Sequence, residues 1–79
     1  MRVEVILPKW GMTMQDGTIV SWNIAEGAHV TEGDAIAVIE TEKVEADLLA
    51  PATGTIVEIV VAEQETVDVG EVIAWLESE

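Results

Sequence analysis

The fold is decided by a stretch that occurs twice: G-T-I-V-S-W-N-I-A-E-G-A-H-V-T-E-G-D-A-I-A-V-I-E-T-E at residues 17–42, and G-T-I-V-E-I-V-V-A-E-Q-E-T-V-D-V-G-E-V-I-A-W-L-E-S-E at residues 54–79. The two segments align without a gap, 37 positions apart, and 12 of the 26 aligned pairs are identical. About two or three identities would be expected by chance, and two copies are too few for a solenoid, which needs about three or more. We therefore expect a pair of repeats that closes on itself with two-fold pseudo-symmetry.

Each repeat is expected to form two strands around a turn. In the first strand apolar and polar residues alternate, and the residues predicted to face the core are Val20, Trp22, Ile24, Val57, Ile59 and Val61. The second strand, A-I-A-V-I-E or V-I-A-W-L-E, is almost continuously apolar, as for a strand buried on both faces. Gly33 and Gly70 are equivalent turn positions, which indicates a positive φ or a close approach of the backbone.

Further strands are expected at Arg2–Leu7 and near Val44–Leu49, which makes about eight in all. The predicted fold is all-β: a flattened barrel (barrel-sandwich hybrid) of two four-stranded antiparallel sheets. The residues between the copies, 43–53, show no visible likeness to residues 6–16, which precede the first copy.

Length and charge describe one small acidic domain, residues 1–79, with 16 acidic residues, three basic residues and a net charge of −13. Nucleic acids and anionic membranes bind proteins through Lys and Arg, so neither is an expected partner. The absence of cysteine excludes disulfides, thiolate metal sites and a cysteine nucleophile. No apolar run is long enough for a membrane span or a signal peptide, and a cytoplasmic location is expected.

No catalytic or metal-binding group is expected either. The single histidine, His29, has no nucleophile paired with it in the sequence and falls in a turn, as an ordinary surface histidine would. The carboxylates lack the D-x-D-x-D-G spacing of a calcium loop and are typical of a solvated face.

The repeat gives the segment after Glu42 a special place. It corresponds to the C-terminus after Glu79, so a two-fold axis would put Lys43 at the pole opposite the chain ends, on a turn that projects into solvent. Its charged neighbours are Glu40, Glu42, Glu45 and Asp47. A plain solvated lysine, or an exposed ion pair that contributes ~0–1 kcal/mol, is the alternative to a functional role.

Three separated segments then agree in order and spacing with a known family: L-P-K-W-G-M-T-M-Q-D-G-T-I at residues 7–19, E-G-A-H-V-T-E-G-D-A-I-A-V-I-E-T-E-K-V-E at residues 26–45, and L-A-P-A-T-G-T-I-V-E-I at residues 49–59. Along essentially its whole length the chain resembles the lipoyl domains of the dihydrolipoamide acyltransferase component of 2-oxoacid dehydrogenase complexes. The loop in the first segment is more similar to acetyl-transferring, branched-chain or acetoin-type domains than to succinyl-transferring ones.

In that family a lysine in an E-T-D-K-A type hairpin carries lipoic acid as an amide, and the resemblance gives this role to Lys43. Glu replaces Asp and Val replaces Ala beside it. The residues implied in recognition by the modifying enzyme are Glu40, Thr41, Glu42, Val44 and Glu45. The family pattern also has glycines at the places of Gly27, Gly33 and Gly54, and Gly70 is the repeat counterpart of Gly33.

The resemblance implies a non-catalytic carrier, in which a lipoyl-lysine swinging arm moves acyl groups and electrons between enzymes. A covalently attached cofactor would also explain how a chain without cysteine takes part in thiol chemistry. The implied partners are a thiamine-diphosphate-dependent 2-oxoacid decarboxylase, the acyltransferase core, dihydrolipoamide dehydrogenase, and a lipoate ligase or lipoyl transferase; the domain itself is expected to be monomeric. The loop implied in decarboxylase recognition comprises Pro8, Lys9, Trp10, Gly11, Met12, Thr13 and Met14. Packing of its apolar residues against the core is the alternative.

Other carriers and an adaptor are the competing interpretations. Biotinyl domains share this kind of fold but flank their lysine with methionines, where this chain has Glu42 and Val44. The glycine-cleavage carrier protein is a longer chain. An unmodified barrel-sandwich adaptor would leave the E-T-E-K-V sequence without a cause. We expect either an N-terminal module of a larger acyltransferase or a free-standing carrier.

Overall fold

A computed structural model of the chain describes residues 1–12 and 14–79. These residues form eight strands: β1 (Arg2–Ile6), β2 (Asp16–Trp22), β3 (His29–Val30), β4 (Ala35–Glu40), β5 (Glu45–Leu49), β6 (Gly54–Ile59), β7 (Thr66–Asp68) and β8 (Val72–Ser78). The Val, Ile and Thr residues that dominate them favour extended backbone because their branched side chains pack well on a pleated surface. Within the described ranges there is no helix that could cross a membrane.

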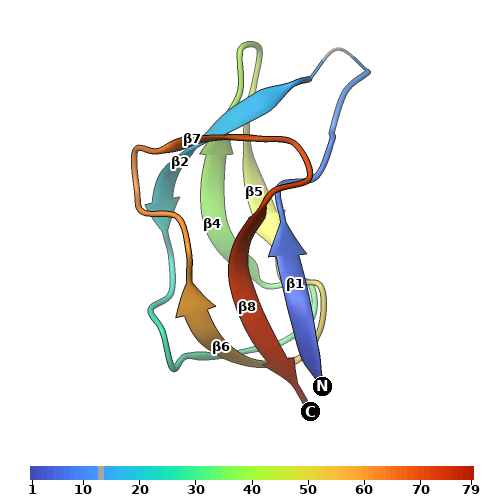
Figure 1. Cartoon of the computed structure of the whole chain (residues 1–79), viewed down its shortest axis with the longest axis vertical. Coiled ribbons are helices and arrows are strands. Elements are labelled where there is room, and N and C mark those ends of the chain that lie inside the picture. The colour runs from blue at the N-terminus through green and yellow to red at the C-terminus, as the bar shows by residue number, and fades with distance from the viewer. Residues whose placement is uncertain (13) are drawn as a thin grey trace.

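The strands form two four-stranded antiparallel sheets, in the orders β1-β8-β6-β3 and β5-β4-β2-β7 (Figure 1). One core of aliphatic side chains is buried between them, and its largest fully buried members are Leu7, Ile19, Ile36, Ile39, Ile56, Ile73, Leu76, Val5 and Val30. The molecule is elongated, with extents of 34 × 21 × 17 Å. This architecture confirms the predicted flattened barrel of two sheets.

The two-fold pseudo-symmetry is visible in the pairing of the strands. Strands β2, β3 and β4 of the first repeat correspond to β6, β7 and β8 of the second, and the two sheet orders are the same under this exchange. The short strand of each repeat pairs with a strand of the other repeat: β3 of the first repeat pairs with β6, and β7 of the second repeat pairs with β2. The register shifts also coincide, between Ile19 and Ser21 in β2 and between Ile56 and Glu58 in β6.

These bulges correct one detail of the sequence analysis. The alternating pattern predicts that Val20 and Val57 face the core, and this prediction is wrong. Ile19 and Ile56, one position earlier, are fully buried, whereas Val20 is half-buried and Val57 is 38% exposed. The extra residue in each bulge shifts the side-chain alternation by one position. Beyond the bulges the prediction holds, and the residues that pack inward there are Trp22, Ile24, Ile59 and Val61.

The two-fold relation extends to β1 and β5, outside the repeated stretch. Residues 1–8 correspond to residues 44–51, 43 positions later, and only the proline that ends each segment is identical. The carbonyl oxygens of Leu7 and Ala50 are equivalent, and each accepts a hydrogen bond from the N–H of an equivalent glycine, at 2.9 and 3.0 Å. The whole fold is therefore duplicated.

The comparison of residues 43–53 with residues 6–16 misses this likeness because the offset there is 43 positions instead of 37. The difference of six lies in one connection. Eight residues, 9–16, join the first proline to β2 and its Gly17, whereas two residues, 52–53, join the second proline to Gly54. The segment 9–16 is thus an insertion that the symmetric fold does not need, which marks it as a candidate for function.

The glycines explain the tightest parts of the backbone. Gly33 and Gly70 both have a φ of +92°, which confirms the prediction for this pair. Gly27 has a φ of +91°, and its repeat counterpart Gln64, at 72°, is the one non-glycine residue with positive φ in the described ranges. Gly54 serves a close approach instead, because a Cβ there would lie 2.1 Å from the backbone oxygen of Glu77.

Candidate functional site

Lys43 lies at the apex of the hairpin that joins β4 to β5. In Figure 1 this hairpin forms one end of the long axis, and both chain termini lie at the other end. The side chain of Lys43 is exposed, as are those of Glu42, Val44 and Glu45. The position that the repeat predicts for Lys43 is therefore the position that the fold gives it.

The hairpin turn is held by Thr41 rather than by glycine or asparagine. The Thr41 N–H donates to the Val44 carbonyl oxygen at 2.8 Å. The Thr41 hydroxyl donates to the same oxygen at 3.0 Å and accepts from the Val44 N–H at 3.2 Å. Glu42 and Lys43 have no positive φ, so the turn is not one of the primed types that two-residue hairpins favour. Three hydrogen bonds between Thr41 and Val44 thus close the turn, and Glu42 and Lys43 lie at its exposed tip.

A similar arrangement, without the covalent connection between the two strands, occurs where the first and last strands meet at the chain ends. Ser78 is the repeat counterpart of Thr41, and Met1 corresponds to Val44. The Ser78 N–H and hydroxyl both donate to the Met1 carbonyl oxygen, at 2.8 and 2.9 Å. The Lys43 hairpin is therefore the covalently closed copy of the pole at which the termini meet.

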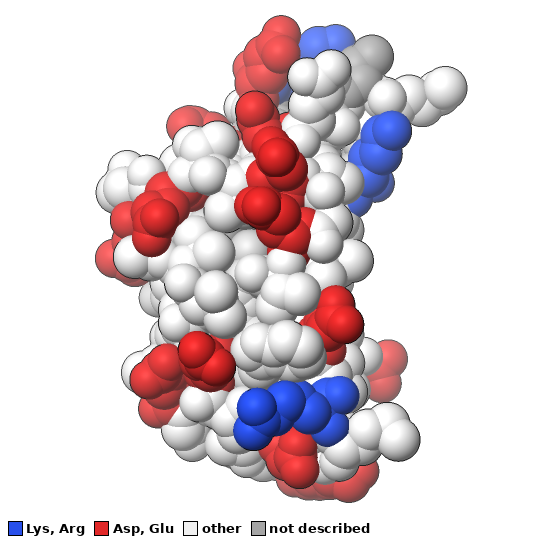
Figure 2. All heavy atoms as spheres, viewed as in Figure 1, with Lys and Arg blue, Asp and Glu red and all other residues white. Residues whose placement is uncertain are grey.

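The carboxylates around Lys43 do not neutralise it. Glu40, Glu42, Glu45 and Asp47 are all exposed, and Figure 2 shows acidic side chains over the viewed face, including the end that carries the hairpin. In the described part of the chain, the groups within ion-pair distance are the Met1 amino group with Glu77, and His29 with Glu79, of which the second is an ion pair only when the imidazole is protonated. Lys43 takes part in neither, so the alternative of an ion-paired lysine finds no support among these residues.

The inserted loop lies beside the hairpin. Trp10 is 41% exposed and Met12 is 94% exposed, whereas Met14 is half-buried and packs against the core. The main-chain N–H of Trp10 donates to the Met14 sulfur at 3.4 Å, which holds the Met14 side chain against the loop backbone. Lys9 and Gly11 are exposed and Pro8 is half-buried; Thr13, also expected in the recognition loop, lies outside the described residues. Core packing therefore accounts for Met14 but not for Trp10 or Met12.

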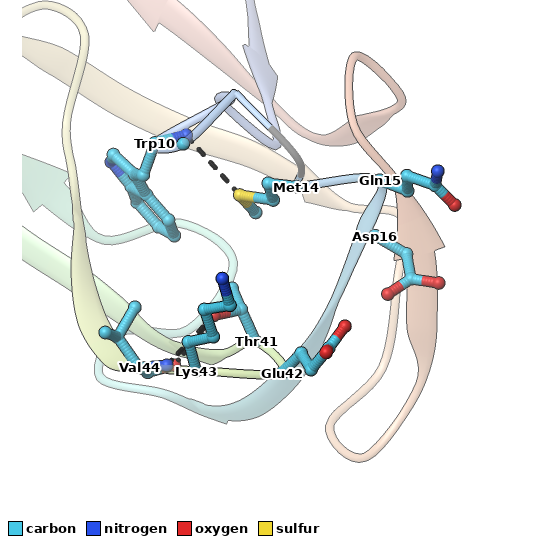
Figure 3. Close-up of a pocket in the computed structure, with 9 residues that line it drawn as sticks. Trp10, Met14, Gln15, Asp16, Thr41, Glu42, Lys43 and Val44 are labelled. Atoms are coloured by element: carbon cyan, nitrogen blue, oxygen red, sulfur yellow. Dashed lines mark hydrogen bonds between the residues drawn. The ribbon is translucent and has the colours of Figure 1, made fainter.

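Loop and hairpin together enclose a groove of about 390 Å³ (Figure 3). Its lining consists of Trp10, Gly11, Met14, Gln15, Asp16, Thr41, Glu42, Lys43 and Val44. Figure 3 shows the side chain of Lys43 extending from the hairpin toward the side on which Trp10 and Met14 lie. In the sequence, loop and hairpin are separate features. The one signal that could join them is the two-fold axis, which brings the connection from β1 to β2 to the same pole as the connection from β4 to β5.

The other ionisable groups considered in the sequence lie apart from Lys43 or form no cluster in the described residues. The Lys43 amine is exposed and carries no ion pair in the described part of the chain, so an acylating enzyme can reach it. His29 lies at the opposite pole with its Nε2 bonded to Glu79. Among residues 1–12 and 14–79 no group of three His, Cys, Asp or Glu side chains could hold a metal ion.

A Thr41→Val substitution should loosen the hairpin without unfolding the domain. It removes both hydroxyl hydrogen bonds at nearly constant volume, and each typically contributes about 0.5–1.5 kcal/mol. We expect amide hydrogen exchange of Val44 to accelerate about tenfold relative to the wild type. Thr41→Ser, which keeps the hydroxyl, is the matched control. Unchanged exchange at Val44 in Thr41→Val would show that the backbone bond alone fixes the turn.

Comparison with known proteins places the chain in a family. A family model described as "Biotin-requiring enzyme" matches residues 3–76. Over 76 residues, 96% of this chain, it is 41% identical to the dihydrolipoyllysine-residue acetyltransferase component of the acetoin cleaving system of Bacillus subtilis, and 40% identical to the lipoamide acyltransferase component of the branched-chain alpha-keto acid dehydrogenase complex of the same organism. It spans 19% and 18% of the lengths of those proteins.

A solved structure is also similar: the solution structure of the lipoyl domain of the 2-oxoglutarate dehydrogenase complex from Azotobacter vinelandii. The TM-score is 0.78 at 36% sequence identity, and the match covers 98% of this chain and 99% of that one. The likeness therefore extends over the whole of a domain that was solved on its own.

Proposed function

Because this chain belongs to the family of biotin- and lipoyl-attachment domains, as a lipoyl domain of the acyltransferase type, we propose that it carries lipoic acid as an amide on Lys43. One observation carries the choice of residue. Lys43 is an exposed amine at the apex of the Thr41-closed hairpin, at the pole opposite the chain ends. Lys9 is exposed as well, but it lies on the loop and not on a hairpin turn.

The bound lipoyl group supplies a cyclic disulfide that accepts acyl groups and electrons. The residues of this chain hold and present it. Lys43 contributes the amide nitrogen, and the three hydrogen bonds between Thr41 and Val44 fix where that nitrogen points. Presentation on a rigid body raises the local concentration of the arm at partner active sites. The domain is a carrier module, and we propose that it performs no catalysis itself.

The proposed partners follow from the relatives, whose names describe acyltransferase components of acetoin, branched-chain and pyruvate systems. We infer that this chain is the lipoyl module of such a longer component. It would visit a thiamine-diphosphate-dependent decarboxylase, the acyltransferase core and dihydrolipoamide dehydrogenase in turn, after modification by a lipoate ligase or lipoyl transferase. A cytoplasmic location and a monomeric domain remain predictions of the sequence.

Association with the decarboxylase should depend on ionic strength. The domain carries a net charge of −13, and amidation of Lys43 removes the one cation among the hairpin carboxylates. We expect the association rate of the lipoylated domain to fall at least about tenfold between roughly 0.02 M and 0.5 M salt, because steering by opposite charge is screened. Surface-coupled binding kinetics measure it, and Glu42→Gln should reduce the salt dependence. This prediction assumes that the decarboxylase presents a basic approach channel to the acidic hairpin, and equal rates at both salt concentrations would contradict it.

The test of the proposed function is covalent loading. The unmodified domain is incubated with lipoate, ATP and a lipoate ligase, and in parallel with biotin, ATP and a biotin ligase, and intact mass and peptide mapping follow. We expect one lipoyl group per chain, on Lys43, and no biotin. Biotin on Lys43 would establish the biotinyl alternative. An unmodified chain in both reactions would favour the structural adaptor.

A further inference from the structure

We propose that the groove between the inserted loop and the hairpin is a resting site for the lipoyl chain on Lys43, seated against Trp10 and Met14. The inference rests on the proposed function, because it takes Lys43 as the attachment residue. It adds a binding site within the domain for the group that the domain carries.

The attachment point lies at the groove itself. Lys43 is itself part of the groove wall, and its side chain extends toward the loop (Figure 3). An acyl chain attached to its Nζ would therefore begin at the groove rather than above open solvent. The volume of about 390 Å³ lies within the range of ~300–1,000 Å³ that small-molecule sites usually have.

The lining of the groove suits the chemistry of the lipoyl chain. The lipoyl chain is an uncharged alkyl amide that ends in a cyclic disulfide, and its formation removes the positive charge of Lys43. Opposite the hairpin, the groove offers an indole from Trp10 and a thioether from Met14, and Val44 adds an exposed apolar surface on the hairpin side. Alkyl groups gain by leaving water for such surfaces, and divalent sulfur packs favourably against aromatic rings.

The Met14 side of the groove is preorganised. The main-chain N–H of Trp10 donates a hydrogen bond to the Met14 sulfur, which holds the Met14 side chain against the loop backbone before any ligand arrives, and Met14 also packs against the core. Trp10 remains 41% exposed, so its indole is accessible to a chain that enters the groove. The loop that carries both residues, 9–16, is six residues longer than its counterpart in the other half of the molecule.

The affinity of the groove for the lipoyl chain has to be weak, because a carrier must release its arm to the partner enzymes. Attachment to Lys43 makes binding intramolecular, with an effective concentration on the order of millimolar or above, so that even a weak intrinsic affinity gives substantial occupancy. Glu42 and Asp16 at the groove wall keep its mouth polar. An arm docked about two thirds of the time would still be released for every partner.

The test compares three forms of the domain: unmodified, octanoylated on Lys43, and lipoylated on Lys43. Nuclear magnetic resonance spectra should show shifts of the Trp10 indole N–H and the Met14 methyl group on lipoylation, with smaller ones on octanoylation. The Met12 methyl group is the internal control, because Met12 is in the same loop, is 94% exposed and does not line the groove. Shifts confined to residues 42–44 would overturn the proposal.

A second measurement is reactivity. Reduction of the lipoyl disulfide by a water-soluble phosphine should be about threefold slower in the wild type than in Trp10→Ala, the protection given by an arm docked about two thirds of the time. Met12→Ala should react as the wild type does. Equal rates in Trp10→Ala and wild type would overturn the resting site while leaving carriage intact. Failure of Lys43 to accept lipoate, seen by intact mass, would instead refute the proposed function and the resting site together.

Discussion

Replacement of Lys43 by arginine is expected to abolish lipoylation of the domain completely while leaving its fold intact. Arginine keeps the length and the charge of the side chain, but its guanidinium cannot be deprotonated in a protein and does not act as an acyl acceptor. Lys43 is exposed and makes no ion pair within residues 1–12 and 14–79, so stability should change by no more than about 0.5 kcal/mol. Intact mass after ligase treatment and a thermal melt measure the two quantities.

Lys9→Arg is the matched control, because Lys9 is the only other lysine and is also exposed near this pole. It should accept one lipoyl group, as the wild type does. Lipoyl addition to Lys43→Arg, or its loss from Lys9→Arg, would move the attachment point from the hairpin to the loop and remove the basis of the proposed function.

The largest effect on stability is expected from Gly54→Ala. A Cβ at Gly54 would lie 2.1 Å from the Glu77 backbone oxygen and 2.9 Å from Ser78 Cα. These atoms belong to β8, which pairs with β6 at this point, so relief requires the two strands to separate. We expect a loss of about 3 kcal/mol, which is a large share of the ~5–15 kcal/mol that stabilises a typical domain. The melting temperature should fall by about 15 °C.

Gly11→Ala provides the comparison, because a Cβ at Gly11 would meet nothing within 4 Å and its φ is not positive. Its melting temperature should stay within about 2 °C of the wild type. If the melting temperature of Gly54→Ala were as close to the wild type as that of Gly11→Ala, β6 and β8 would be able to separate at this end without loss of stability.

The sequence predicts most of this fold because the repeat is long and keeps its register. Identity between the copies fixes the equivalence of β4 and β8, and with it the pole on which Lys43 stands. The likeness of β1 to β5 cannot be read in the same way, since Pro8 and Pro51 are the only identical residues and the offset changes by six. Burial of β1 and β5 requires only apolar residues at equivalent positions, and many different sequences meet that requirement.

Two further features depend on three-dimensional structure. The bulges at Val20 and Val57 leave no mark in the sequence, because valine suits either face of a strand. The groove requires that loop and hairpin meet, and 31 or more positions separate Trp10 from the hairpin residues that line it. Composition indicates that Trp10 and Met12 are exposed apolar residues, but it does not show which residues lie next to them.

The terminal pole also decides how the domain can be handled. Met1 and Ser78 are hydrogen-bonded neighbours, and the longest dimension of the body, 34 Å, separates them from the hairpin. A purification tag, a fluorescent protein or a sensor chip joined to either end would therefore face away from Lys43. Immobilised samples made through the first or the last residue should give the same kinetics with a ligase in solution.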